Sequence, residues 1–159
     1  MAKKLKAGII GCGRIASLFA SDKKRKGIVT HAQAYLARKD IELVAACDLD
    51  RQRLEEFSQT WNISRTYTDF RDMLAQEALD LVSICTPPAS HFEIASEAIL
   101  KSVQAVFCEK PIASSLVEAD ELVTLVQKHG TVFAVNHSRR WDAFEQKISA
   151  FICSGKLGK

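Results

Sequence analysis

The amino-acid sequence predicts an α/β fold, with a doubly wound and mainly parallel sheet and helices on both faces of the sheet. Short apolar runs alternate with stretches of helical periodicity along most of the 159 residues, which is the pattern of repeated βαβ units. The first apolar run, Leu5–Ile10, leads directly into Gly-Cys-Gly-Arg-Ile-Ala, a glycine-rich turn of the kind that carries a strand into a helix. A chain of this length fits one domain, which we expect to extend over residues 1–159.

The expected elements follow one another in the order of a parallel α/β sheet. The strands are expected at Leu5–Ile10, Ile41–Cys47, Thr66–Tyr67, Leu81–Cys85, Ala105–Cys108 and Val132–Val135. The helices are expected at Arg14–Ala20, Ala32–Arg38, Arg51–Thr60, Phe70–Gln76, Ser90–Lys101, Leu116–His129 and Trp141–Cys153. The polar residues Ser21–Val29 lengthen the first crossover, and we interpret them as an insertion that forms either a flap near the site or a surface loop.

The composition excludes several classes of protein. The formal charge of +3 is too small to indicate a nucleic-acid binder, and the hydrophobic content of 47% is that of an ordinary globular domain. No apolar run approaches the roughly 18 residues of a membrane span, so we expect no membrane association and a cytoplasmic protein. The 5 cysteines show no C-x-x-C spacing, which predicts neither a disulfide framework nor a metal site.

The glycine-rich turn has the composition of a pyrophosphate-binding loop. Gly11 allows the tight turn, Gly13 lets the backbone approach phosphates with no side chain between, and Ala16 is small enough for close packing. Arg14 and Ile15 begin the expected helix, whose free N–H groups and partial positive charge would face the phosphates. The turn therefore predicts a dinucleotide as the ligand.

Asp48 lies just past the second expected strand, where a carboxylate can accept hydrogen bonds from the hydroxyl groups of the adenosine ribose. A 2′-phosphate at this place would be repelled by about 1–4 kcal/mol at about 4 Å, for effective dielectric constants between those of water and a protein surface. This repulsion favours NAD over NADP. The alternative that Arg51 or Arg53 turns toward a 2′-phosphate stays open, so NADP is not excluded.

The fourth expected strand ends in Cys-Thr-Pro-Pro, at the point where the strand order of such a sheet reverses and ligands bind. Thr86 and Pro87 are therefore expected beside the central ribose or the nicotinamide of the cofactor. The alternative is an ordinary strand-to-helix turn in which the prolines begin the helix. His91 follows in the next helix, and it either faces the pyrophosphate or serves as a capping or packing residue.

Glu109, Lys110 and Pro111 follow the fifth expected strand at the same edge of the sheet. A lysine at the mouth of a dinucleotide cleft can donate a proton to a substrate oxygen or take one from it. Pro111 restricts the backbone that aims the lysine. From the residues alone, Lys110 is either this proton-transfer group or an ordinary surface lysine.

Taken in order, these segments resemble the oxidoreductase family of glucose–fructose oxidoreductase, inositol dehydrogenase and MocA. The resemblance rests on Gly-Cys-Gly-Arg-Ile-Ala, Ala-Cys-Asp, Ile-Cys-Thr-Pro, Ser-His-Phe-Glu-Ile-Ala and above all Glu-Lys-Pro, and it extends to Asn-His-Ser-Arg-Arg-Trp at residues 136–141. It implies a Rossmann domain that binds NAD(P), with Glu109 at the cofactor and Lys110 beside the nicotinamide and the substrate hydroxyl. Arg140 is implied near the nicotinamide or the substrate.

The resemblance also implies hydride transfer between nicotinamide and a sugar, a polyol or a derivative, in the full-length protein. Members of the family carry a second α/β domain that contacts the substrate, and this sequence stops at residue 159, about where that domain would begin. We therefore expect residues 140–159 to lead toward a missing domain, and the chain alone to bind a dinucleotide without turnover. A homo-oligomer stays open, as does the alternative of a non-catalytic regulator that binds NAD(P).

Overall fold

The computed structural model describes residues 4–158 and contains a 6-stranded sheet in which neighbouring strands are parallel. The strands are β1 (Leu5–Ile10), β2 (Ile41–Cys47), β3 (Arg65–Tyr67), β4 (Leu81–Ile84), β5 (Ala105–Glu109) and β6 (Val132–Asn136). Their order, β3-β2-β1-β4-β5-β6, reverses direction between β1 and β4. The predicted doubly wound parallel sheet is confirmed, and each expected strand end lies within about one residue of the observed end.

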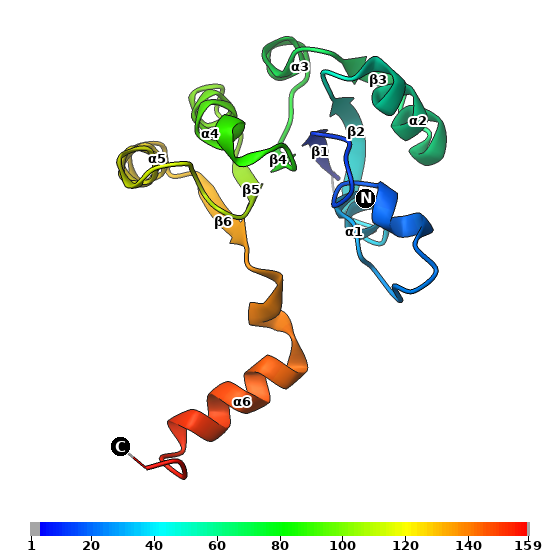
Figure 1. Cartoon of the computed structure of the whole chain (residues 1–159). Helices are drawn as coiled ribbons and strands as arrows, with labels where there is room; N and C mark the ends of the chain where they lie inside the picture. The colour runs from blue at the N-terminus through cyan, green and yellow to red at the C-terminus, as the bar shows by residue number, and fades with distance from the viewer. Residues whose placement is uncertain (1–3, 159) are drawn as a thin grey trace.

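Helices cover both faces of the sheet (Figure 1). On one face lie α1 (His31–Leu36) and α2 (Arg51–Trp61), and on the other lie α3 (Phe70–Gln76), α4 (His91–Leu100) and α5 (Leu116–His129). Short 3₁₀-helices occur at η1 (Leu18–Ser21), η2 (Pro88–Ser90) and η3 (Ser138–Trp141), and α6 (Ala143–Cys153) ends the described chain. The predicted arrangement of helices on both faces is confirmed.

Polar side chains fix several of these helix ends. The side chain of Thr30 accepts a hydrogen bond at the start of α1, and that of Asp50 accepts two at the start of α2. Ser115 and Glu118 form a reciprocal capping box at the start of α5, and Gly130 ends that helix with a φ of 67°. These caps satisfy backbone groups that have no partner within the helix.

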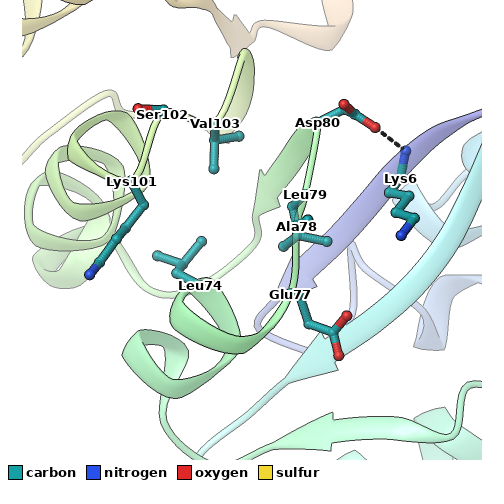
Figure 2. A pocket seen from close by; sticks show the side chains of 9 residues that line it. All are labelled: Lys6, Leu74, Glu77, Ala78, Leu79, Asp80, Lys101, Ser102 and Val103. Carbon is teal, nitrogen blue, oxygen red and sulfur yellow. Dashed lines mark hydrogen bonds between the residues drawn. The ribbon is translucent and has the colours of Figure 1, made fainter.

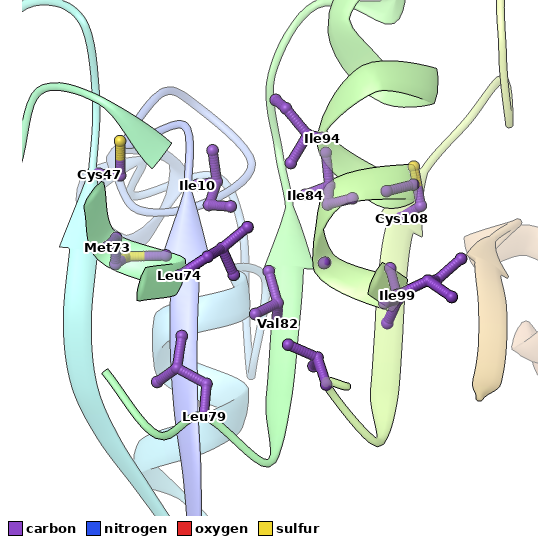
Figure 3. Packing of buried hydrophobic residues seen from close by; sticks show 14 of the residues in the cluster. Ile10, Cys47, Met73, Leu74, Leu79, Val82, Ile84, Ile94, Ile99 and Cys108 are labelled. Atoms are coloured by element: carbon purple, nitrogen blue, oxygen red, sulfur yellow. The ribbon is translucent and has the colours of Figure 1, made fainter. Parts of the chain in front are cut away.

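The larger core lies between the sheet and α3, α4 and α5 (Figure 3). Side chains alternate between the two faces along a strand, so every second residue of β4 and β5 enters this core. The buried residues that do so are Val82, Ile84, Val106 and Cys108. The intervening residues Ser83, Phe107 and Glu109 therefore lie on the face covered by α1, where Glu109 is in register with Asn136 of β6. This placement gathers polar side chains beneath α1 near the carboxyl edge of the sheet.

The helix expected at Arg14–Ala20 is not present, and that prediction was wrong. The chain instead makes a turn that is followed by η1. The carbonyl groups of Ile15 and Ala16 accept hydrogen bonds of 3.1 Å from the backbone N–H groups of His31 and Ala32. These carbonyls are therefore engaged by α1 and do not bond the residues four positions further along, as a helix requires. The expected insertion thus lies in the first crossover, between the turn and α1.

The last helix, α6, projects away from the sheet (Figure 1). It has no buried residue, and Phe144, Phe151 and Ile152 are among its exposed apolar side chains. The layered α/β structure therefore ends with β6. Within residues 4–158, no helix combines the length and the apolar character needed to cross a membrane.

Candidate functional site

The parallel strands bring the predicted site residues to one edge of the sheet. Gly11 follows β1, Asp48 follows β2, Thr86 lies just beyond β4 and Lys110 follows β5. Since the strand order reverses between β1 and β4, the chain continues from these two strands to helices on opposite faces, and parallel α/β sheets bind ligands at such a point.

Gly11 brings the loop after β1 into direct contact with the loop after β4. Its φ is 90°, which residues with a side chain rarely adopt. A Cβ atom here would lie 2.7 Å from the carbonyl carbon of Cys85 and 2.8 Å from the backbone nitrogen of Thr86. The fold itself therefore requires a glycine at this position.

Gly13 stands in a different environment. Its φ lies outside the left-handed region, and a Cβ atom here would meet nothing within 4 Å. The backbone N–H groups of Gly13, Arg14 and Ile15 donate to no acceptor within the described part of the chain. Successive free donors beside open space form a concavity that suits an anion. The packing of the described chain therefore does not explain this glycine.

Asp48 is hydrogen-bonded to the glycine-rich turn. One carboxylate oxygen, Oδ2, accepts a hydrogen bond of 2.7 Å from the backbone N–H of Cys12, and Oδ1 accepts one of 2.9 Å from Asp50. The guanidinium of Arg53 lies 3.6 Å from Oδ2 and 3.4 Å from a carboxylate oxygen of Asp50. A carboxylate has about four acceptor positions, so Asp48 keeps capacity for a further hydroxyl group.

The loop after β4 presents Thr86 and Pro87 at the same edge. The hydroxyl oxygen of Thr86 accepts a hydrogen bond of 2.8 Å from the Ser90 hydroxyl, and the Thr86 side chain is half-buried. Pro87 is exposed and directly precedes η2. The loop is therefore a fixed turn with an exposed apolar tip.

His91 does not face the cleft, which corrects the expectation that it contacts the cofactor. The side chain is fully buried, with Nδ1 at 2.7 Å from the carbonyl oxygen of Pro111 and Nε2 at 2.9 Å from that of Thr86. A carbonyl oxygen can only accept, so the ring donates to one of these oxygens or, when doubly protonated, to both. The packing alternative therefore describes His91, which joins the loop after β4 to the loop after β5.

Glu109 belongs to a buried polar cluster beneath α1. Its Oε1 atom lies 3.0 Å from Nε2 of His31 and accepts a hydrogen bond of 2.6 Å from Nδ2 of Asn136. The other ring nitrogen of His31, Nδ1, lies 2.8 Å from the hydroxyl oxygen of Ser83, which also bonds the hydroxyl group of Tyr35. The cluster thus joins α1, β4, β5 and β6.

This cluster keeps the Glu109 carboxylate ionised. Burial alone would raise the pKa of Glu109, but hydrogen bonds from His31 and Asn136, the charge of His31 and the backbone N–H of Lys110 outweigh it. The pKa of Glu109 therefore lies below its ordinary value. Glu109 faces the interior of the α1 side rather than open solvent, and it serves as a fixed anion at the end of β5.

Lys110 and Arg140 are both exposed. Within residues 4–158, the Lys110 side chain takes part in no ion pair or hydrogen bond, so its amine is free at the carboxyl edge of the sheet. Arg140 lies in η3, beyond β6, and no side-chain hydrogen bond in the described chain joins it to the loops after β1, β4 or β5. The structure thus brings Lys110 to the edge shared by the loops after β1, β4 and β5, and it does not bond Arg140 to these loops.

A separate cavity of about 260 Å³ lies at the opposite edge of the sheet (Figure 2). It is lined by Lys6, Leu74, Glu77, Ala78, Leu79, Asp80, Lys101, Ser102 and Val103. Asp80 accepts a hydrogen bond of 2.7 Å from the backbone N–H of Lys6, which closes one side of the cavity. None of the predicted site residues lines it. Among the described residues, no group of three or more His, Cys, Asp or Glu side chains could hold a metal ion.

Comparison with known proteins connects this geometry to a family. Residues 5–137 match the family model GFO_IDH_MocA, described as an oxidoreductase family with an NAD-binding Rossmann fold. The chain is 31% identical to the uncharacterised oxidoreductase YrbE of Bacillus subtilis and 31% identical to a D-apiose dehydrogenase of Paraburkholderia graminis. These matches include 99% and 98% of this chain, but only 42% and 38% of the two relatives. The chain thus spans less than half the length of these curated relatives.

Solved structures of similar sequence share the fold. A myo-inositol 2-dehydrogenase from Lactobacillus plantarum superposes with a TM-score of 0.81 at 30% identity, over 99% of this chain and 43% of that one. An oxidoreductase from Agrobacterium radiobacter, crystallised with NAD+, L-tartaric acid and magnesium, gives 0.81 at 29% identity, over 99% of this chain and 42% of that one. The chain belongs to the Gfo/Idh/MocA oxidoreductase family and corresponds to the NAD-binding Rossmann domain of its members.

Proposed function

We propose that the turn after β1 binds the pyrophosphate of NAD(H), and that Lys110 manages the substrate proton when the full-length protein oxidises or reduces a sugar or polyol. The observation that carries the proposal is the run of free backbone N–H groups at Gly13, Arg14 and Ile15 beside open space. Phosphate oxygens are strong acceptors and carry the charge that such a run of donors favours.

The surroundings of Asp48 support NAD(H) rather than NADP(H). The remaining acceptor positions of its carboxylate suit the hydroxyl groups of the adenosine ribose. Arg53, one of the two arginines that could compensate a 2′-phosphate, is already paired with both Asp48 and Asp50. A 2′-phosphate would add negative charge beside two carboxylates, so we expect tighter binding of the cofactor that lacks it.

Lys110 is the group in this chain best placed to act on a substrate. The nicotinamide supplies or accepts a hydride when the cofactor is bound. The amine of Lys110 can hold the proton of a substrate hydroxyl group or return it, because it is exposed at the end of β5 and has no partner within residues 4–158. The substrate class follows from relatives named as dehydrogenases of myo-inositol and D-apiose. A substrate must also be held in place, and we expect the remainder of the full-length protein to do so.

The first experiment is a titration of the purified chain with NADH and NADPH, followed by nicotinamide fluorescence. We expect NADH to bind more tightly, and tighter binding of NADPH would contradict the assignment around Asp48. The absence of binding by either cofactor, in a sample that unfolds cooperatively, would contradict the proposed site.

The catalytic part of the proposal needs turnover by the full-length protein. We expect Lys110→Ala to abolish turnover and to retain cofactor binding. Lys101→Ala is a matched control, since Lys101 lies at the opposite edge of the sheet. Turnover by Lys110→Ala at the rate of the wild type would contradict the catalytic role of Lys110, whereas a wild-type protein that binds the cofactor and shows no turnover would favour a non-catalytic, NAD(P)-binding regulator.

A further inference from the structure

Lys110 lies between two residues that are anchored from opposite faces of the sheet. On the face of α1, the carboxylate of Glu109 is bonded to His31 and Asn136. On the face of α4, the carbonyl oxygen of Pro111 is bonded to His91. The two anchors approach one short segment, Glu109–Pro111, from elements far apart in the sequence.

The first anchor is rigid because His31 is held on three sides. Its ring is 5% exposed and lies 5.0 Å from the ring of Phe107, with an angle of 39° between the two planes. One ring nitrogen contacts Glu109 and the other contacts the buried hydroxyl group of Ser83. A ring packed and bonded in this way has one available orientation, so it fixes the position of the carboxylate.

The second anchor ties the same segment to the loop after β4. His91 begins α4, is fully buried, and contacts the carbonyl oxygens of Pro111 and Thr86 with its two ring nitrogens. The backbone on the far side of Lys110 is therefore held relative to β4. Lys110 itself has no such contact, so its direction depends on its two neighbours.

We propose that His31 and His91 are positioning residues for Lys110, and that together they aim its side chain from the carboxyl edge of the sheet. The inference rests on the role proposed for Lys110. A proton-transfer group must be held close to its productive position, and an error of about 1 Å can cost about 100-fold in rate. Neither histidine touches the reacting atoms, and both act through the backbone on either side of Lys110.

The direct test is the backbone order parameter of Lys110, measured by ¹⁵N relaxation on this chain without ligand. We expect a value of about 0.85 in the wild type and a fall toward about 0.6 in His31→Phe, which keeps a ring over Phe107 but removes both nitrogens. Glu109→Gln keeps the acceptor oxygen and is expected to retain the wild-type value. His129→Ala removes an exposed histidine at the end of α5 and is the matched control.

The outcome that would overturn the inference is an unchanged order parameter at Lys110 in folded His31→Phe and His91→Phe. If these variants do not fold, Asn136→Ala removes one hydrogen bond to Glu109 from a half-buried site at the edge strand. We expect an intermediate fall in the order parameter of Lys110 there, and no fall would equally overturn the inference.

A second measurement separates this inference from the proposed function. A displaced Lys110 affects turnover by the full-length protein and not cofactor binding. We expect His31→Phe to lower kcat of the full-length protein about 100-fold and to leave the Kd for NADH unchanged. A weakened Kd for NADH with an unchanged kcat would indicate damage to the cofactor site and contradict the positioning role. If the wild type does not bind NADH, the proposed function fails, and the order parameter still decides whether the two histidines position Lys110.

Discussion

The two glycines of the turn after β1 allow folding and cofactor binding to be tested separately. Gly13→Ala introduces a methyl group that meets nothing within 4 Å, on a backbone whose φ is not left-handed. Replacement of glycine at such a position restricts the unfolded chain and stabilises a protein by about 0.4–1 kcal/mol. We therefore expect the free energy of unfolding of Gly13→Ala to equal or slightly exceed that of the wild type.

Binding of NADH is expected to change in the opposite direction. The new methyl group would occupy the space beside the free N–H groups of Gly13, Arg14 and Ile15. The loss of one hydrogen bond to a charged phosphate costs about 1.5–3 kcal/mol, which raises the Kd for NADH about 10- to 150-fold. The assays are urea unfolding and a fluorescence titration of the same preparation.

Gly11→Ala is the contrasting variant. The left-handed backbone costs an alanine about 1–3 kcal/mol, and its Cβ would lie 2.7 Å from the backbone of Cys85, so the loop after β4 must also move. We expect a loss of about 3 kcal/mol or more in the free energy of unfolding. Unaltered NADH binding by Gly13→Ala, or equal destabilisation by both variants, would refute the distinction drawn between the two glycines.

Three further outcomes are expected. The pKa of Glu109 is lowered in the folded protein. The carboxylate therefore stabilises the fold above its ordinary pKa of 4.5, and this stabilisation is lost as the pH falls through the lowered pKa. In this pH window, the free energy of unfolding in urea should depend less on pH in Glu109→Gln than in the wild type. Asp48→Ala leaves the buried N–H of Cys12 without its acceptor, so weaker NADH binding should be accompanied by a loss of about 1–3 kcal/mol in the free energy of unfolding. A thiol reagent at pH 8 should label the exposed Cys153 first, because burial raises the pKa of Cys47 to about 12, and mass spectrometry would identify the labelled thiol.

The sheet could be predicted from the sequence because its signals are local. A strand buried on both faces is a continuous apolar run, and β1 and β2 each contain such a run before a polar or glycine-rich turn. The parallel order then places the ends of these strands at one edge. The positions of Gly11, Asp48, Thr86 and Lys110 follow from that rule, without any knowledge of their contacts.

The first crossover could not be predicted in the same way because its determinants are distant in sequence. The residues after Gly13 have ordinary helical character, and what prevents a helix is the engagement of the Ile15 and Ala16 carbonyls by α1. These hydrogen bonds depend on where α1 lies after the insertion. Local propensity is overridden here by a tertiary hydrogen bond.

The anchoring role of His31 was missed for a related reason, although one signal was available. Val106 and Cys108 are apolar and alternate along β5, so Glu109 must lie on the opposite face, next to α1. A carboxylate brought toward the interior requires donors, and a histidine in the first turn of α1 was a candidate. The parallel register of β5 with β6 supplies the second donor, Asn136, and that register is not apparent from the sequence of either strand.

The loop after β4 determines how the two halves of the site are spaced. Gly11 lets the glycine-rich turn pack directly on the backbone of Cys85 and Thr86, and His91 joins the carbonyl oxygen of Thr86 to that of Pro111. The turn after β1 and the segment that carries Lys110 are thus both held against the loop after β4. In the proposed binding mode a dinucleotide would have to reach both, so this segment would set the distance between its phosphates and Lys110. His91 therefore joins the two parts of the candidate site from the protein interior.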